Sequence, residues 1–143
     1  MPVLRSAGII FFKNTPEGRR YLILRSSKHI PERGDYWDIP KGELEVKEKG
    51  IDAAKREAKE EVGIENFSLV DGFKFTAQYF SRREGKSIPK YVAIFLAEAG
   101  SRKVKLSWEH DKYEWASLEE ALKKTTTMRE AIKKADEFLQ KSS

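Results

Sequence analysis

Three glutamates, Glu57, Glu60 and Glu61, stand close together in a segment rich in helix-forming residues. Residues three and four apart share one face of a helix, so these side chains are expected to project together. Carboxylates this close repel one another unless a cation lies among them. Hard oxygen ligands select magnesium, manganese or calcium, and magnesium commonly combines carboxylates with phosphate oxygens of a substrate. The spacing therefore predicts a site for a divalent cation and a diphosphate.

Three residues around this cluster are candidates for shaping it. Arg56 directly precedes the first glutamate, and we expect it to pair with Glu48 and fasten the preceding loop to the helix. Gly42, at the entrance of that loop, permits a tight bend and leaves its carbonyl free to face the metal.

The alternative is a helix whose charged face is only solvated. Charged residues make up 36% of the chain, with Lys and Glu prominent, a balance found in proteins from hot environments. An isolated run of glutamates in such a protein usually forms a solvated surface. The composition indicates a thermophile-like protein in either case, and the alternative predicts that it binds no metal.

Composition limits the remaining possibilities. The 143 residues, 39% of them hydrophobic, suit one domain over 1–143 with a core of its own. The chain has no cysteine and two histidines, which excludes disulfides, thiolate nucleophiles and Cys-based zinc sites. No run approaches the roughly 20 apolar residues of a membrane span, so we expect a soluble, cytoplasmic protein. We also expect it to be a monomer. The net charge of +5 favours an anionic partner.

The hydrophobic pattern predicts a mixed sheet with a helix after its third strand and further helices at the end, hence one layered α/β (α+β) domain. The first helix is expected to start at Asp52 as its N-cap and to end at Gly63. Ser117 and Thr127 are expected to cap the two C-terminal helices. Strands are expected at residues 3–12, 21–24, 67–80, 90–99 and 112–116, and residues 37–42 are expected to form a short strand that runs into a loop because of Pro40.

The full spacing from Gly42 to Ile64, G-x5-E-x7-R-E-hydrophobic-x-E-E-x-G-hydrophobic, resembles the signature of the Nudix hydrolases. The resemblance implies an α/β/α sandwich with a mixed sheet and a catalytic loop-helix-loop, and metal-dependent hydrolysis of diphosphate linkages in nucleotides. It makes the three helix glutamates catalytic ligands of Mg²⁺, with Mn²⁺ as a substitute. It gives Glu48, Arg56 and Gly63 structural roles in the motif.

The segments 72–74, 95–98, 109–115 and 118–121 extend the resemblance to asymmetric diadenosine tetraphosphate hydrolases of the animal and archaeal type. The implied reaction cleaves diadenosine tetraphosphate to ATP and AMP. Tyr79 stands where such enzymes stack an adenine, and a phenol ring offers a flat surface for a purine. The alternative for Tyr79 is an ordinary strand tyrosine that covers the core.

Two lysines match phosphate-binding positions of the same family. Lys41 directly precedes Gly42, and Lys90 opens a strand; the alternatives are a solvated lysine and an edge-strand charge. His29 is a further candidate phosphate contact, with a solvent-exposed histidine as the alternative.

Two residues near the last strand complete the predicted site. Glu109 matches a distal metal ligand or general base, against an exposed loop carboxylate, with Glu98 as the competing candidate. Tyr113 is either the other side of a base clamp or a residue that packs beside Trp115.

Two other functions remain open from the sequence. A pyrophosphohydrolase acting on the 5′-triphosphate of RNA would use similar residues and suit the basic charge. A nucleotide-binding sensor would keep the fold and lose the chemistry, although the intact Glu57, Glu60 and Glu61 argue against it.

Overall fold

Two long strands form the first hairpin of the sheet. The structure is a computed structural model that describes residues 3–28 and 34–141, so His29 lies outside the described residues. Strands β1 (Leu4–Thr15) and β2 (Gly18–Ser26) pair antiparallel, with Phe12 opposite Tyr21. The expected hairpin is confirmed, and both strands run further than predicted.

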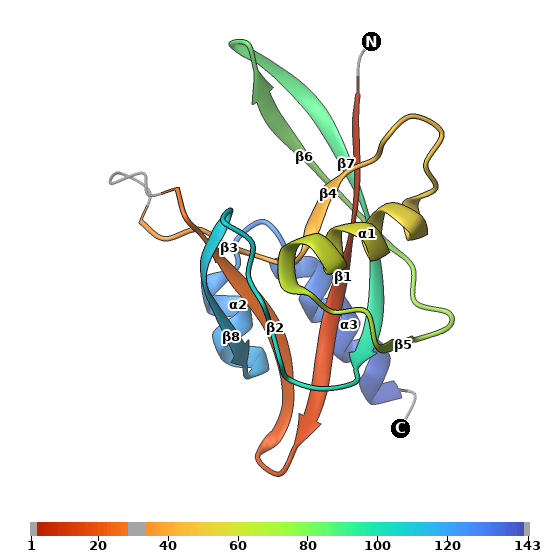
Figure 1. The fold of residues 1–143 in the computed structure, drawn as a ribbon, viewed down its shortest axis with the longest axis vertical. Coiled ribbons are helices and arrows are strands. Elements are labelled where there is room, and N and C mark those ends of the chain that lie inside the picture. The colour runs from red at the N-terminus through yellow and green to blue at the C-terminus, as the bar shows by residue number, and fades with distance from the viewer. Residues whose placement is uncertain (1–2, 29–33, 142–143) are drawn as a thin grey trace.

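The other described residues add six strands and three helices to this hairpin, and Figure 1 shows how these elements are arranged. The helices are α1 (Gly50–Val62), α2 (Leu118–Lys124) and α3 (Arg129–Lys141). None of them is long and apolar enough to span a membrane, and no other helix occurs in the described ranges. The strands are β3 (Trp37–Asp38), β4 (Lys41–Glu43), β5 (Phe67–Leu69), β6 (Phe75–Arg83), β7 (Lys86–Ala99) and β8 (His110–Ala116).

The sheet is mixed, and β1 and β7 lie at its centre. They pair parallel from Leu4 opposite Lys90 to Phe12 opposite Glu98, whereas every other pairing among the described strands is antiparallel. β4 pairs with the first half of β1, and β8 lies along β2. This arrangement brings the loop before α1 and the start of β8 toward the same part of the sheet.

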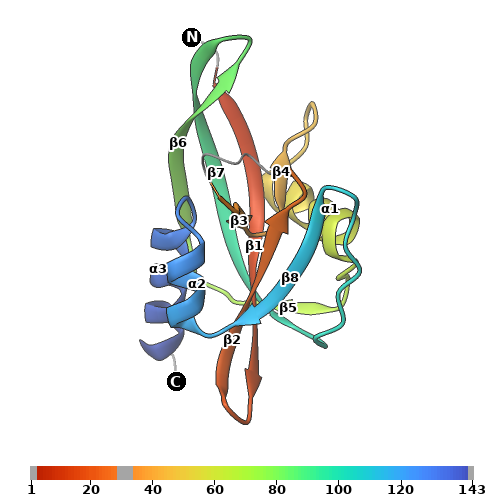
Figure 2. The same ribbon diagram turned by 90° about the vertical axis from the view of Figure 1, so that its left-hand side faces the viewer.

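Alternate residues of β1 face two separate cores. Ile10 and Phe12 join the cluster formed with α2 and α3, whereas Ala7, Ile9 and Phe11 join the cluster formed with α1. Figure 2 shows α1 on one side of the sheet and α2 and α3 on the other. A strand buried on both faces belongs to the middle layer of a three-layer domain. The predicted α/β/α sandwich is confirmed.

Helix α1 begins earlier than the sequence predicted. Lys49 is the N-cap residue and makes no side-chain capping bond, and Asp52 lies in the first turn. The prediction of Asp52 as the N-cap is therefore wrong; its carboxylate lies where the helix dipole favours negative charge. Gly63 ends the helix as predicted, with φ 68° and its N–H donating to the carbonyl of Lys59 (3.1 Å).

One predicted strand is interrupted, and the short strand predicted before Pro40 is followed by a second one. Residues 67–80 form β5 and β6, separated by a turn in which Gly72 has φ 89°. Residues 37–42 form β3 and the start of β4 with Pro40 between them. Ser117 caps α2 as predicted, accepting from the N–H of Glu120 (3.2 Å).

Candidate active site

Arg56 ties the loop before α1 to the helix. Its Nε and Nη2 donate to the two carboxylate oxygens of Glu48 at 2.9 and 3.0 Å, which confirms the predicted pair. Nη1 donates to Glu57 (2.9 Å) and Glu60 (3.3 Å), and Nη2 also donates to the carbonyl of Glu43 (3.1 Å). The hydrogen bonds from Arg56 hold the pKa of Glu48 down to about 2. One guanidinium group thus fixes the conformation of the loop and two of the three helix glutamates.

Gly42 lets strand β4 pass directly against Glu57. A Cβ atom added at Gly42 would overlap the Glu57 carboxylate. Gly42 is held in this place by β4 pairing with β1, where it lies opposite Ala7. The absence of a side chain at Gly42 therefore makes room for a carboxylate at the junction of β4 and α1.

Glu61 lies in the protein interior, not on the charged outer face of α1 where the sequence pattern placed it. It is 4% exposed, and it neighbours Val62 on the buried side of the helix. Burial, followed by the hydrogen bond with Glu57, raises the pKa of Glu61 well above its ordinary value. A buried carboxyl group in contact with a second carboxylate fits a divalent cation, because the cation offsets the charge that burial and the neighbouring carboxylate disfavour.

Glu61 opens onto a cavity of about 190 Å³. Three of the predicted site residues, Lys41, Glu61 and Glu109, line it together although they come from β4, α1 and the loop before β8. The other lining residues were not predicted: Ser26, Tyr36, Asp38, Ile39 and His110.

Two ammonium groups lie near the ring of Tyr79. Lys41 Nζ and Lys90 Nζ are 5.9 and 5.8 Å from the ring centroid, and Lys41 also pairs with Asp38 at 3.0 Å. Burial is the largest single effect and works against the charge of Lys41, but the Asp38 carboxylate together with the hydroxyl groups of Tyr79 and Tyr36 raises the pKa of Lys41. Burial and then the nearby Lys41 lower the pKa of Lys90 to about 8. The structure brings together three of the four predicted substrate-binding residues.

Other predicted residues lie apart from this cavity. The Glu60 side chain is 58% exposed and is held by Arg56, and Tyr113 is 39% exposed on β8. Glu98 lies eight residues along β7 from Lys90, roughly 26 Å away at the usual rise of a strand. Of the two competing carboxylates, Glu109 is the one beside Glu61.

Within residues 3–28 and 34–141, no three His, Asp or Glu side chains converge to hold a metal ion. The hydrogen bonds of Arg56 explain this, because they draw Glu57 and Glu60 toward the guanidinium group. The expectation that all three glutamates project together is met only by Glu57 and Glu61, which contact each other. The roles of these carboxylates as ligands remain predictions.

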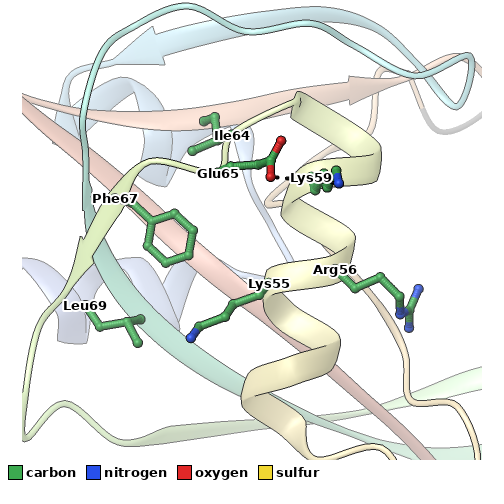
Figure 3. Close-up of a pocket in the computed structure, with 7 residues that line it drawn as sticks. All are labelled: Lys55, Arg56, Lys59, Ile64, Glu65, Phe67 and Leu69. Atoms are coloured by element: carbon green, nitrogen blue, oxygen red, sulfur yellow. Dashed lines mark ion pairs between the residues drawn. The ribbon is translucent and has the colours of Figure 1, made fainter.

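A second cavity, of about 460 Å³, lies against the outer side of α1 (Figure 3). Phe67 and Leu69 of β5 form its apolar wall, and Lys59 pairs with Glu65 at its rim (3.8 Å). Figure 3 shows Arg56 pointing away from this wall. Since Glu57, Glu60, Glu61 and Glu109 do not line this cavity, the smaller one is the candidate active site.

Asp38 and His110 are the main residues that sequence reasoning missed. Asp38 is 7% exposed, between the buried Trp37 and Ile39, and a charged residue in such a run is a signal of a paired or functional carboxylate. His110 lies in the segment 109–115 that carries part of the family resemblance, but the sequence predicted no role for it. No local pattern could place either residue beside Glu61.

Known proteins resemble this chain in sequence over most of its length. The model of the NUDIX domain matches residues 3–136. The chain is 32% identical over 148 residues to the asymmetrical bis(5′-nucleosyl)-tetraphosphatase of Mus musculus, covering 95% of each protein. It is 29% identical over 140 residues to an RNA pyrophosphohydrolase of Bartonella henselae, covering 83% of this chain and 79% of that protein.

Among solved structures, an Ap4A hydrolase of C. elegans in a binary complex superposes with a TM-score of 0.81. The two sequences are 31% identical, and the superposition covers 96% of this chain and 98% of the C. elegans chain. The resemblance of the motif between Gly42 and Ile64 thus extends over nearly the whole chain. The chain belongs to the NUDIX family and is a Nudix hydrolase.

Proposed function

We propose that this enzyme hydrolyses diadenosine tetraphosphate asymmetrically to ATP and AMP. The observation that carries the proposal is the juxtaposition of Lys41, Lys90 and Tyr79, because two cations and a flat ring suit a phosphate chain and a purine. The Mus musculus relative and the C. elegans structure, both named for this class of hydrolase, support it.

Magnesium is the proposed cofactor, with manganese as a substitute. Glu57, Glu60, Glu61 and Glu109 and the carbonyl of Gly42 are the proposed ligands. The contact between the buried Glu61 and Glu57 supports a divalent cation, and oxygen donors favour magnesium. The bound cation neutralises the diphosphate and lowers the pKa of the attacking water.

The side chains have separate tasks in the proposed reaction. Tyr79 stacks on one adenine, and Lys41 and Lys90 offset the charge of the phosphates next to it. A glutamate takes the proton of the attacking water; Glu109 and the glutamates of α1 are the candidates. A bond forms between the water oxygen and the terminal phosphorus next to that adenosine. The bond from this phosphorus to the bridging oxygen breaks, which releases ATP and leaves AMP.

A nucleotide panel with product identification tests the proposal. With magnesium and diadenosine tetraphosphate we expect equal amounts of ATP and AMP, and in ¹⁸O-labelled water we expect the label in AMP. Two molecules of ADP would exclude asymmetric cleavage. A wild-type protein inactive on every nucleotide would favour the nucleotide-binding sensor.

RNA carrying a 5′-triphosphate is the second candidate substrate. Arg82, Arg83 and Lys86 give the β6–β7 hairpin a basic tip, and the net charge is +5. The Bartonella henselae relative, named an RNA pyrophosphohydrolase, also supports it. Comparing kcat/KM on the dinucleotide and on triphosphorylated RNA decides between the two, since a strong preference for RNA would reject the dinucleotide as substrate.

A further inference from the structure

Strand β8 carries a bulge where it meets the end of β2. Lys112 pairs with Arg25, but the next residue of β2, Ser26, pairs with His110 and not with Asp111. Consecutive residues of a regular strand face opposite sides, so His110 would otherwise share the face of Lys112, away from α1. The extra residue turns His110 to the side of the sheet that α1 covers.

An ion pair and three hydrogen bonds hold this bulge. Arg25 donates to both carboxylate oxygens of the extra residue, Asp111, at 2.9 and 3.2 Å. Ser27 donates from its N–H to the carbonyl of Glu109 (2.9 Å) and from its hydroxyl to that of Trp108 (2.7 Å). The N–H of His110 donates to the carbonyl of Ser107 (3.2 Å). The direction of the His110 side chain is therefore fixed from both sides of the bulge.

The bulge brings His110 against Glu61. The side chain of His110 is 11% exposed, and its Nδ1 lies 3.7 Å from Oε1 of Glu61. This nitrogen is buried and has no hydrogen-bond partner among the described residues. A buried polar atom without a partner is costly, and a hydrogen bond to Glu61 requires an approach of less than about 1 Å.

We propose that His110 is a positioning residue for Glu61. When the cation is bound and Glu61 is ionised, the neutral imidazole would donate from Nδ1 to Oε1 of this carboxylate, which leaves the other oxygen to face the cavity. Without this bond, Glu61 is free to turn toward Glu57, its present partner. The inference rests on the proposed function, in which Glu61 binds the cation. Groups that orient metal ligands in this way commonly change metal affinity about 10–100-fold.

Cation binding without substrate tests the role of the hydrogen bond. In His110→Leu, which keeps bulk but removes the donor, we expect manganese affinity by calorimetry to fall about 10–100-fold. His110→Asn, which offers a donor near the position of Nδ1, is expected to restore most of it. Unchanged thermal unfolding of both variants separates lost positioning from lost folding. Manganese affinity of His110→Leu equal to that of wild type would overturn the proposal.

Nitrogen NMR tests directly which ring nitrogen of His110 carries the proton. The chain has two histidines, so His29→Gln leaves His110 as the single imidazole. With manganese replaced by diamagnetic magnesium, we expect the Nδ1–H tautomer, and Glu61→Gln is expected to abolish its preference. An Nε2–H tautomer would overturn the proposal. Neither calorimetry nor NMR needs a substrate. An enzyme inactive on all nucleotides would therefore contradict the proposed function and leave the role of His110 intact. Absence of cation binding would overturn both the proposed function and the role of His110.

Discussion

Replacing Gly42 by alanine tests the close approach of β4 to α1. Gly42 does not have a positive φ, so alanine fits its backbone conformation. The added methyl group would nevertheless overlap the Glu57 carboxylate. Because contacting carbon atoms lie about 3.5–4.0 Å apart, the carboxylate must move by more than about 1 Å.

This displacement sets the size of the expected effect. Glu57 is held by Arg56 and contacts Glu61, so its carboxylate cannot move without disturbing both partners. A misplacement of about 1 Å at a catalytic group costs roughly 100-fold in rate, which corresponds to about 2.7 kcal/mol. We therefore expect kcat of Gly42→Ala to fall roughly 100-fold, with weaker manganese binding.

Gly50→Ala is the matched control. Its Cβ would lie 3.7 Å from that of Ala93, an ordinary contact, and alanine favours the first turn of α1. Turnover of diadenosine tetraphosphate, manganese calorimetry and thermal unfolding are measured on both variants. We expect the control to match wild type in all three. Gly42→Ala with wild-type turnover would refute the steric argument and the place of Glu57 in the site.

Substitutions at three other positions have defined outcomes. Arg56→Lys removes the pair of hydrogen bonds to Glu48, so its melting temperature is expected to be lower than that of wild type above pH 4.5. The difference is expected to shrink as the pH falls toward about 2, where Glu48 becomes protonated in wild type too. Wild-type kcat/KM is expected to fall as the pH rises through about 8, where Lys90 loses its charge, and Lys90→Arg keeps it constant to higher pH. Tyr79→Leu is expected to raise KM for the dinucleotide, because about 1–3 kcal/mol of stacking free energy is lost. The KM of Tyr79→Phe is expected to stay near that of wild type.

The local part of the site was predictable from the sequence. Gly42, Glu48, Arg56 and Gly63 belong to one loop and one helix, so their contacts follow from spacing along the chain. The two cores were also predictable, since the apolar run of β1 gives both faces of a strand that is buried on both sides.

The contacts across the sheet were not predictable. The bulge at Asp111 decides which way His110 faces, and no periodicity in β8 marks it. The ion pair between Lys41 and Asp38 depends on β4 starting directly after Pro40, where the sequence predicted a loop. A missed signal was the Asp71-Gly72 pair, a common turn sequence that divides β5 from β6.

The burial of Glu61 makes cation binding a determinant of stability. A glutamate whose pKa is raised in the folded protein costs stability as the pH rises above its ordinary value, because folding then requires uptake of a proton. Glutamine at this position carries no such cost. We therefore expect Glu61→Gln to unfold at a higher temperature than the metal-free wild type at neutral pH, and the difference to disappear near pH 4.

Manganese is expected to reverse this order. At a hundredfold excess over its dissociation constant, a ligand stabilises the folded state by about 2.7 kcal/mol, or roughly 5–10 °C for a domain of this size. Wild type should show this rise in a thermal scan, and Glu61→Gln should show little of it. An equal rise in both proteins would place the cation elsewhere, and a wild type already more stable than the variant without metal would mean that Glu61 is fully paired inside the protein.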